Sequence, residues 1–474
     1  PCVWVCGELR PTDQWGQSAQ DTENSLRAEG SVAAIGVAGE NQVRFATISN
    51  GGRHAGRGGL GAVMGSKNLK AVVVRGDVST PVARPAELTA IARDLAQRSL
   101  GPETARYREQ GTVGNLSAFN RLAILPTRNF QHSQLDGAED LASALAQGTR
   151  ASDRNACASC TIGCEHHYRF SGHSVRLEYE SLFALGPLCG VAGAEDIVSA
   201  AQRCDEWGID TVSAGATVAF AMECAERGLL DAEKAPRFGD ASSLLQALDN
   251  IAHRRGLGDQ LAQGTRRMAH ALGQNTIAFA PQVKGLEIPG YEPRALQAMA
   301  LGFAVGTRGA DHNRSGAYEV DLSEKADRLR GNARSAELAT ETENQAAILD
   351  SLILCKFLRG IFSDLPSEAA EILGSVTGWD IDAAELQAVA QRIISLRKAF
   401  NIREGWCPED DTLPSRFLQE PLRDGASSGA VLPAERLKEM VRTYNLTRGW
   451  DADGHLPAAV LDDLSSDFPG PVLK

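Results

Sequence analysis

The spacing of apolar residues changes near residue 80, and this change constrains the fold more than any other feature of the sequence. Before it, three short β-branched segments bounded by Gly or Asn are typical of strands between turns: 31–39, 43–49 and 69–75. From Pro85 onward, apolar residues recur three or four positions apart, as in amphipathic helices, over 88–100, 195–207, 212–230, 243–255, 260–272, 336–358, 383–402 and 434–444. The chain is therefore predicted to be β-rich at its start and mainly helical afterwards, with boundaries near 77–86 and 274–292.

Charge and hydropathy argue against two classes of protein. The 474 residues include 48 Lys and Arg against 60 Asp and Glu, a net charge of -12, whereas a nucleic-acid binder shows a basic face. The longest uncharged apolar stretch, 182–194, has 13 residues and contains Gly and Pro, short of the roughly 18 to 20 that a membrane helix needs. Ten cysteines are few for this length and favour a reducing compartment. We therefore expect a cytoplasmic protein that neither binds nucleic acid nor spans a membrane.

The first residues, Pro1-Cys-Val-Trp-Val-Cys6, form an apolar alternation with no initiator Met. They resemble the middle of a β-strand rather than its start. We expect residues before Pro1 to be missing from this chain, although processing or a separate upstream subunit would leave the same sequence.

The strongest local signal is a C-x2-C-x3-C run formed by Cys157, Cys160 and Cys164. Three thiolates this close together are able to bind three corners of one iron-sulfur cubane, leaving the fourth for a distant ligand. Zinc with His166 or His167 as a further ligand is the competing interpretation, and a cluster of packed thiols is a third.

Cys355 is the best candidate for the fourth corner because of its context, at the end of an apolar helical segment. Such a cysteine is more often a small core residue, and both interpretations stand at this point.

Gly56-Arg-Gly-Gly-Leu-Gly61 matches the G-x-G-x-x-G pattern of dinucleotide-binding folds. That fold needs a helix launched from the loop, yet 62–68 leads at once into another predicted strand. What remains is a Gly-rich loop with Arg53, Arg57 and Lys67, which either brings backbone N–H groups against an anionic cofactor or simply connects two strands.

The Asp205-Glu-Trp-Gly208-Ile209-Asp210 segment follows a predicted helix, with Gly208 placed as its C-cap. Its carboxylates are suited to a heterocycle with adjacent N–H donors, and plain helix termination is the alternative. Glu178 and Glu180, together with the 308–312 turn ending in His312, add titratable groups that in isolation are more often surface or core residues.

Together these features resemble the aldehyde ferredoxin oxidoreductase family of tungsten-pterin enzymes. The ordered landmarks are 35–41, 55–70, the cysteine run, 178–181, 204–211, 308–312 and 410–414, so the resemblance covers nearly the whole chain. It implies an α+β fold: a β-rich N-terminal base, incomplete here, over 1–80, and two mainly helical domains over 81–282 and 283–474.

The resemblance also implies the cofactors and the residues that bind them. These are a tungsten, or molybdenum, ion held by two pterins, a [4Fe-4S] cluster, and Mg as an option between the pterin phosphates. The cluster ligands would be Cys157, Cys160, Cys164 and Cys355. One pterin would contact Asp205, Ile209 and Asp210, and the other Asp350 and Leu354, with Arg53 near the phosphates and Arg314 near the pocket.

Glu180 and His312 match the family's acid-base residues beside the metal. The implied reaction is oxidation of an aldehyde to its carboxylic acid, with electrons leaving through the cluster to ferredoxin or an iron-sulfur partner subunit, in a homodimer or larger assembly. The alternatives are a paralogue acting on another carbonyl or aromatic acid, a truncated remnant that keeps only the cluster, and a zinc-stabilised scaffold.

Two departures from the family pattern stand out. Ile353 occupies the place of a family glycine that is expected to let the backbone approach the pterin. The second departure is the start of the chain, because family members begin well before Pro1, and we expect that missing segment to contribute to the base under the cofactor.

Overall fold

The structure is a computed structural model that describes residues 1–149 and 153–467. Its first part is a six-stranded sheet in the order β2-β1-β6-β3-β4-β5, in which β1 and β6 run parallel and every other neighbouring pair is antiparallel. The strands are β1 (Cys2–Val5), β2 (Glu8–Pro11), β3 (Ser31–Ala34), β4 (Ile48–Asn50), β5 (Arg53–Ala55) and β6 (Leu69–Val74). This sheet confirms the β-rich base.

Buried and less buried side chains alternate along the strands, and the buried ones form a small core on one face of this sheet. Val3 and Val5 of β1 are buried while Trp4 between them is not, and Val32 and Val73 face the same side from β3 and β6. The short helices α1 (Ala19–Leu26), α2 (Val37–Glu40) and α3 (Leu60–Ser66) lie in the connections.

The structure differs from the prediction at two places in the base. The expected strand over 43–49 is mostly wrong, because only its last two residues belong to β4. The Gly-rich loop does launch a helix, α3, but its seven residues are followed by β6 and its preceding strand, β5, pairs only antiparallel with β4. The loop is therefore not part of a parallel βαβ unit.

Helices dominate the rest of the chain, which confirms the predicted α+β fold class. From residue 85 to 280 they are α4 (Pro85–Arg98), α5 (Ala105–Gln110), α6 (Asn115–Arg121), α7 (Ala138–Gln147), α8 (Tyr179–Leu185), α9 (Ala194–Trp207), α10 (Thr211–Glu226), α11 (Ala241–His253), α12 (Leu257–Leu261) and α13 (Thr265–Leu272). A three-stranded sheet of β7 (Arg154–Asn155), β8 (Glu165–Phe170) and β9 (His173–Arg176) lies among them.

The remaining elements follow a two-stranded hairpin, β10 (Gln282–Val283) and β11 (Leu286–Glu287). They are α14 (Gln297–Val305), α15 (His312–Ser315), α16 (Tyr318–Asp321), α17 (Ala333–Ser351), α18 (Leu365–Thr377), α19 (Ala383–Arg403), α20 (Ser415–Gln419), α21 (Ala434–Thr447) and α22 (Ala458–Asp467). The helix expected over 336–358 ends at Ser351, so Cys355 lies in the loop after it.

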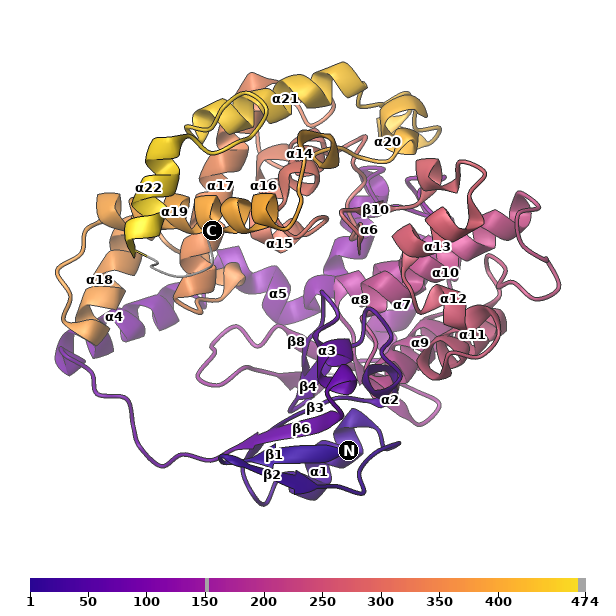
Figure 1. The fold of residues 1–474 in the computed structure, drawn as a ribbon, viewed down its shortest axis with the longest axis horizontal. Coiled ribbons are helices and arrows are strands. Elements are labelled where there is room, and N and C mark those ends of the chain that lie inside the picture. The colour runs from indigo at the N-terminus through magenta and orange to yellow at the C-terminus, as the bar shows by residue number, and fades with distance from the viewer. Residues whose placement is uncertain (150–152, 468–474) are drawn as a thin grey trace.

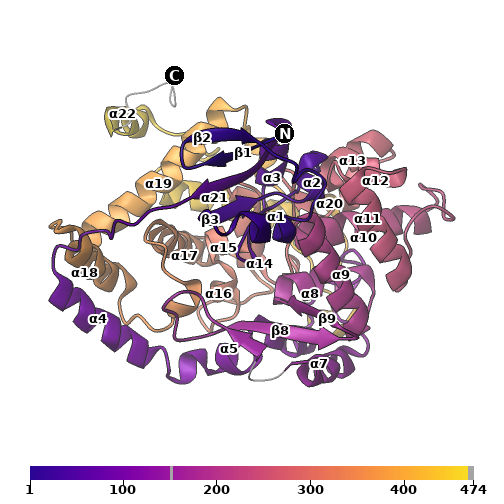
Figure 2. The ribbon, with the colours of Figure 1, turned by 90° about the horizontal axis from the view of Figure 1, so that it is seen from below.

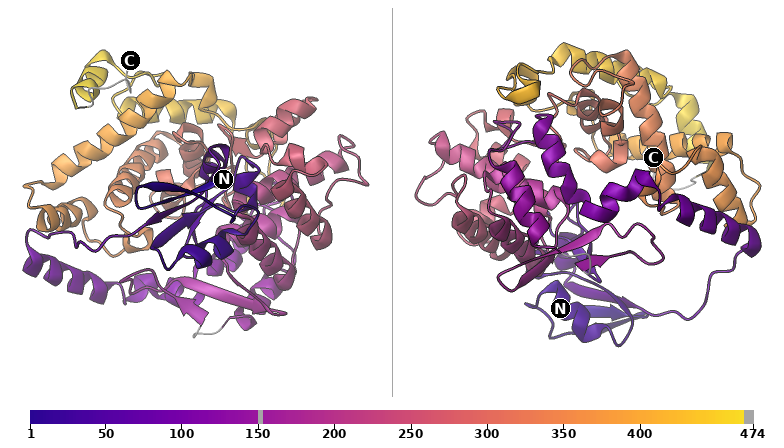
Figure 3. Two further views of the ribbon diagram at one scale, coloured as in Figure 1. Left: turned by 60° about the horizontal axis from the view of Figure 1, so that its bottom comes forward. Right: turned by 180° about the vertical axis from the view of Figure 1, so that it is seen from behind.

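The sheet lies below the junction of two groups of helices (Figure 1). Helices α8 to α13 form one group and α14 to α19 the other, and the view from below shows the sheet lying across their meeting point (Figure 2). After β6 an extended segment leads to α4, which packs beside α18 far from the sheet (Figure 3). The base is thus positioned to contact both helical groups.

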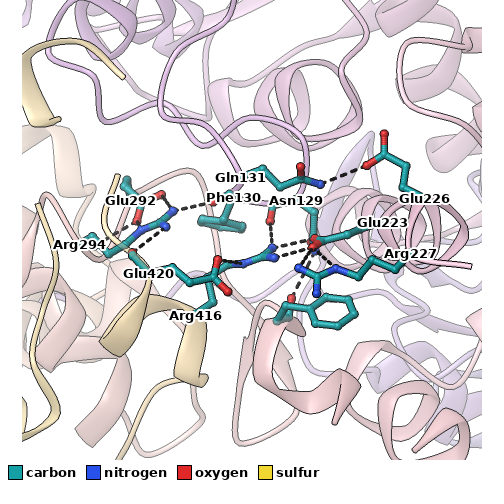
Figure 4. A network of polar contacts seen from close by, with 11 residues as sticks. Asn129, Phe130, Gln131, Glu223, Glu226, Arg227, Glu292, Arg294, Arg416 and Glu420 are labelled. Carbon is teal, nitrogen blue, oxygen red and sulfur yellow. Dashed lines mark hydrogen bonds and ion pairs between the residues drawn. The ribbon is translucent and has the colours of Figure 1, made fainter. Parts of the chain in front are cut away.

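A buried ion-pair network joins α10 to α20 and to the loop at Asn129 (Figure 4). Glu223 on α10 accepts a hydrogen bond from Arg416 on α20 at 2.7 Å and another from Asn129 at 2.6 Å. Arg416 also donates to the backbone oxygen of Asn129 at 2.7 Å. Both charged side chains are 2% exposed. Burying two charges is unfavourable unless further hydrogen bonds offset the loss of water, as the bonds with Asn129 do here.

Two hydrophobic cores run through the helical part. The larger joins residues between Ala38 and Ala310 to a few from 413–437, while the smaller contains only residues from Ala298 onward. The division into 81–282 and 283–474 stays a prediction. Within the described residues no single helix is long and apolar enough to cross a membrane, and one pair, Tyr179–Cys189 with Ala194–Trp207, meets that test only together, with a 117° bend between its parts.

Candidate functional site

The Asp205–Asp210 segment forms the end of α9 and the turn after it. Gly208 ends the helix in the left-handed conformation, with φ at 73°. The backbone N–H of Ile209 then donates to the carbonyl oxygen of Cys204 at 2.9 Å, and that of Gly208 donates to Asp205 at 3.3 Å. This pair of bonds is a Schellman cap, which confirms the predicted role of Gly208.

The N-terminal base holds this turn in place. The N–H of Asp210 donates to the carbonyl oxygen of Phe45 at 3.0 Å. A Cβ atom at Gly36 would lie 2.4 Å from the carbonyl oxygen of Trp207, so only glycine permits this close approach of base and helix. Residues 43–47 therefore leave the sheet in order to pair with the turn.

Arg57, in the Gly-rich loop, connects the base to both helical groups. Its Nε lies 3.3 Å from Oδ2 of Asp210, and its two terminal nitrogens donate to the carbonyl oxygens of Glu287 at 2.6 Å and Ala310 at 2.9 Å. Asp210 also accepts a hydrogen bond from the Ser213 hydroxyl at 2.6 Å. The guanidinium is 13% exposed, and it fixes three segments at one point.

Glu180 on α8 and His312 on α15 face each other, with 3.6 Å between Oε1 of Glu180 and Nε2 of His312. The other Glu180 oxygen accepts the backbone N–H of Gly290 at 2.9 Å. Burial raises the pKa of Glu180 to about 7 and lowers the pKa of His312 to about 3. Oε1 of Glu180 and Nδ1 of His312 are buried without a hydrogen-bond partner among the described residues, so both are available to a bound molecule.

His54 is a third polar group of this kind. Its Nε2 lies 3.2 Å from Oδ1 of Asp205, and its buried Nδ1 has no partner in the described part of the chain. The side chain comes from β5 and is 16% exposed. Base and α9 therefore meet at His54 as well as at Arg57.

These groups surround one cavity of about 470 Å³ at the meeting point of the base and the two helical groups. Of the predicted site residues, the structure brings Asp205, Ile209, Asp210, Glu180 and His312 to its wall. Other parts of the wall are formed by His54, Arg57, Tyr107, Phe119, Tyr179, Tyr291, Tyr318, Phe357 and Arg359. The volume is within the usual range for small-molecule sites.

The four predicted cluster cysteines come from two distant segments, and none of them lines this cavity. Burial raises the pKa of Cys164 to about 12, with the Glu178 carboxylate next in importance and then Cys355, Cys160 and Cys157. Burial also raises the pKa of Cys355, and Cys160 and Cys157 add to it. The thiols of the two segments therefore influence one another electrostatically. Among residues 1–149 and 153–467, no three His, Cys, Asp or Glu side chains are arranged to hold a single metal ion.

The segment after α17 repeats the cap of α9. The N–H of Leu354 donates to Leu349 at 2.8 Å, and that of Ile353 donates to Asp350 at 3.4 Å. Ile353 adopts φ 57°, the left-handed conformation that Gly208 has in the first cap, although it is β-branched. A glycine at this place would suit the same helix cap, and its expected role in close approach to a pterin stays a prediction.

The remaining predicted residues lie outside the cavity wall. Arg314 forms an ion pair with Asp350 at 2.7 Å, and Lys356 lies 3.8 Å from the same carboxylate. Arg53 pairs with Glu165, immediately after Cys164, and remains 43% exposed. Arg53 on β5 thus pairs with the segment that carries Cys164, and Arg314 on α15 pairs with Asp350 on α17, the helix before Cys355.

The sequence places Arg57 in a Gly-rich loop that is able to approach an anionic cofactor, but it does not single out Arg57, His54, Tyr291 or Tyr318 as site residues. Arg57 meets Asp210 and His54 meets Asp205 only in the folded chain. The aromatic residues at 291 and 318 are ordinary core residues by their local pattern. No local signal identifies them.

Comparison with known proteins agrees with this geometry. Residues 90–465 match the family model for "Aldehyde ferredoxin oxidoreductase, domains 2 & 3", and residues 7–76 match the model for the N-terminal domain of the same family. The expectation that the chain lacks the family's N-terminal segment is corrected to this extent, because residues 7–76 match the model of the N-terminal domain.

Individual relatives are consistent with the family matches. The chain is 34% identical to the tungsten-containing aldehyde ferredoxin oxidoreductases of Pyrococcus furiosus and Thermococcus kodakarensis, over 95% of this chain and 76% of each relative. It is 29% identical to the WOR-like subunit of an aliphatic sulfonate oxidoreductase of Pyrococcus furiosus, over 91% of this chain and 69% of that protein.

A solved structure shares the fold. The BamBC active-site complex of benzoyl coenzyme A reductase superposes with a TM-score of 0.79 at 22% identity, over 98% of this chain and 79% of that one. With two family models matched in order over most of its length, the chain is an oxidoreductase that belongs to the aldehyde ferredoxin oxidoreductase family.

Proposed function

We propose that this protein oxidises aldehydes to carboxylic acids at a tungsten, or molybdenum, centre held by two pterins. Electrons would leave through a [4Fe-4S] cluster to ferredoxin or to an iron-sulfur partner subunit. The single observation that carries the proposal is the Glu180–His312 pair, which faces a cavity that is also lined by Asp205, Ile209 and Asp210 of the first expected pterin motif.

The donor set fits a cluster. Cys157, Cys160, Cys164 and Cys355 provide four thiols, and ligation by four cysteine thiolates is the usual requirement of a [4Fe-4S] cluster. Cys157 and Cys355 are exposed, so a cluster at this place would lie near the surface, where a protein electron carrier has access to it.

The cavity fits a large polar cofactor because three buried side-chain atoms on its wall, in Glu180, His312 and His54, have no partner among the described residues. Asp205, Ile209 and Asp210 would contact one pterin, and Asp350 and Leu354 the other. Arg53 would lie near the phosphates of the pterins, and Arg314 would lie near the pocket. A Mg ion between the pterin phosphates is part of the same proposal.

When bound, the metal centre supplies the two-electron oxidation and the transfer of oxygen from water. The chain's own residues handle protons and position. The overall change, RCHO + H2O to RCOOH with two electrons and two protons released, needs a base. Glu180, with a pKa near 7, is able to accept a proton at Oε1. The pKa of His312, lowered to about 3, keeps its imidazole neutral and able to donate or accept one hydrogen bond at neutral pH.

A cytoplasmic location is proposed from cysteine usage. Ten cysteines are few for 474 residues, which is typical of proteins from a reducing compartment. A homodimer or larger assembly, with ferredoxin or a partner subunit as acceptor, is proposed from the family.

The test is elemental analysis of anaerobically purified protein, combined with an aldehyde assay. We expect tungsten or molybdenum together with about four iron per chain. Iron without tungsten or molybdenum, and no aldehyde oxidation after incubation with tungstate, would instead indicate a protein that keeps only the cluster.

A further inference from the structure

We infer that a second cavity binds a small organic carboxylate, with Arg397 as the residue that holds its charge. This cavity of about 360 Å³ lies between α19 and the turn before α15, and its wall includes Arg308, Arg314, Leu396, Arg397 and Phe400. Among the described residues, none lines both this cavity and that of the acid-base pair. Asp350 and Leu354, the expected contacts of the second pterin, do not line it either. The inference therefore goes beyond the proposed function.

The positive charge of the second cavity is only partly balanced. Arg308 is paired with Asp311 at 2.5 Å, and Arg314 is paired with Asp350 at 2.7 Å. Arg397 is partly buried, and within residues 1–149 and 153–467 its side chain has neither an ion pair nor a hydrogen bond. Burial lowers the pKa of the Arg397 guanidinium, and the Arg314 and Arg308 charges lower it further. Three cations thus share two carboxylates at this place.

The acids that oppose this effect on Arg397 are engaged by other cations. Besides its pair in the cavity wall, Asp350 lies 3.8 Å from Lys356. Glu343 is paired with Arg448 at 2.6 Å. An arginine stays charged at every ordinary pH, so the Arg397 guanidinium is a partly buried cation without a partner of its own. One bound monoanion would supply that partner.

The rest of the wall favours an anion with an apolar body. Leu396 and Phe400 line the cavity, and Phe400 remains 45% exposed although Arg403 lies 4.7 Å from its ring centre. The side-chain amide of Asn401 is already used, because it donates to the carbonyl oxygen of Thr307. A carboxylate matches the planar fork of an arginine with two parallel hydrogen bonds, and its carbon chain would cover the apolar wall.

The short helix α15 lies between the two cavities. His312 lines the first cavity, and Arg314, two positions further on, lines the second. Side chains two positions apart on a helix point about 200° away from each other. A carboxylate in the second cavity would compete with Asp350 for Arg314. Its binding is therefore able to act on the helix that carries His312.

The test is calorimetric titration of the purified holoenzyme with hexanoate, acetate and hexanamide. Hexanoate should bind at least about 10-fold more tightly than acetate, because its additional methylene groups contact the apolar wall. Hexanamide has the same carbon chain without the charge and should bind at least about 10-fold more weakly than hexanoate. Arg397→Gln should weaken hexanoate binding about 10- to 100-fold. Arg442→Gln, at an exposed arginine of α21, should leave it unchanged.

Thermal unfolding separates a binding role of Arg397 from a structural one. Without ligand, Arg397→Gln should keep or raise the unfolding midpoint, because it removes an unpaired charge, and its tungsten and iron content should equal that of the wild type. Hexanoate should raise the midpoint of the wild type but not that of the variant.

Four results would each overturn the inference. They are no binding of hexanoate, equal affinity of hexanoate for wild type and Arg397→Gln, acetate or sulfate binding as tightly as hexanoate, and destabilisation of the ligand-free protein by Arg397→Gln. None of these measurements depends on turnover. A failure of aldehyde oxidation would therefore contradict the proposed function and leave this inference standing.

Discussion

Nε2 of His312 lies 3.6 Å from Oε1 of Glu180, and each side chain keeps a buried atom without a partner among the described residues. The distance is too long for a direct hydrogen bond. A bound molecule that reaches both Oε1 of Glu180 and Nδ1 of His312 would give each atom its missing hydrogen bond. Under the proposed function, the pair receives the reacting molecule in this way.

Replacing Glu180 with Gln tests whether its carboxyl moves a proton. The amide keeps the size and is able to accept the Gly290 N–H, but it cannot act as a base. We expect kcat to fall about 10²- to 10⁴-fold with tungsten and iron content unchanged. An unchanged kcat would show that Glu180 does not transfer a proton in the reaction.

The pH dependence of the wild-type enzyme gives a separate test. Because burial raises the pKa of Glu180 to about 7, the carboxyl is protonated below that pH and ionised above it. As a base it is active only when ionised, so kcat/KM should rise with pH through about 7. His312, with its pKa lowered to about 3, should add no inflection between pH 5 and 9. A pH profile that is flat from 5 to 9 would contradict this assignment.

Arg57→Gln should destabilise the protein, because it leaves the Asp210 carboxylate and two carbonyl oxygens without their buried cation. We expect a loss of about 3 kcal/mol in the free energy of unfolding, measured by denaturant titration. Arg121→Gln is the matched control, since the Arg121–Glu139 pair is exposed and its loss should change the free energy by less than about 1 kcal/mol. Equal losses in the two variants would mean that Arg57 does not join the three segments.

Cys355→Ala should remove one cluster ligand. We expect the [4Fe-4S] signal in electron paramagnetic resonance to be lost or converted to that of a three-iron cluster. Cys407→Ala changes another exposed cysteine, far along the chain, and should leave the signal intact. An unchanged signal in Cys355→Ala would return this residue to a structural role.

Ile353→Gly should stabilise the protein despite removing a large side chain. Ile353 is 91% exposed and holds φ 57°, a conformation that costs about 1 to 2 kcal/mol for a residue with a Cβ. After the greater entropy of Gly in the unfolded chain is subtracted, the free energy of unfolding should rise by about 0.5 to 1 kcal/mol. Ile353→Ala keeps the Cβ and should gain less. A loss of stability in the Gly variant would show that the Ile353 side chain makes a stabilising contact.

Much of the fold follows from sequence patterns. The change of period near residue 80 predicts the sheet and the helices after it, and Gly208 predicts the end of α9, because both depend on local chemistry. The Cys157, Cys160 and Cys164 run and the proposed partner Cys355 are also identifiable from the sequence. For these thiols the structure shows electrostatic influence of Cys355, Cys160 and Cys157 on Cys164. Their grouping as cluster ligands, like the roles of Glu180 and His312, remains a prediction.

Other features required the tertiary structure. Residues 43–47 have the composition of a strand but pair with the turn after α9, so their position is set by a contact far away in the sequence. The helix before Cys355 ends without the usual glycine, so its end at Ser351 carries no breaker signal. The Gly-rich motif places Arg57 in a candidate cofactor-binding loop, but its contacts with Asp210, Glu287 and Ala310 join segments that no motif connects, so they could not be predicted.

The most direct test of the central claim is anaerobic oxidation of benzaldehyde by the purified holoenzyme, with a one-electron viologen as acceptor and the carboxylic acid counted by chromatography. We predict benzoate formation with two viologen molecules reduced per acid, as the loss of two electrons requires. A protein that contains tungsten, or molybdenum, and about four iron per chain but forms no acid from this or any other aldehyde would contradict the account.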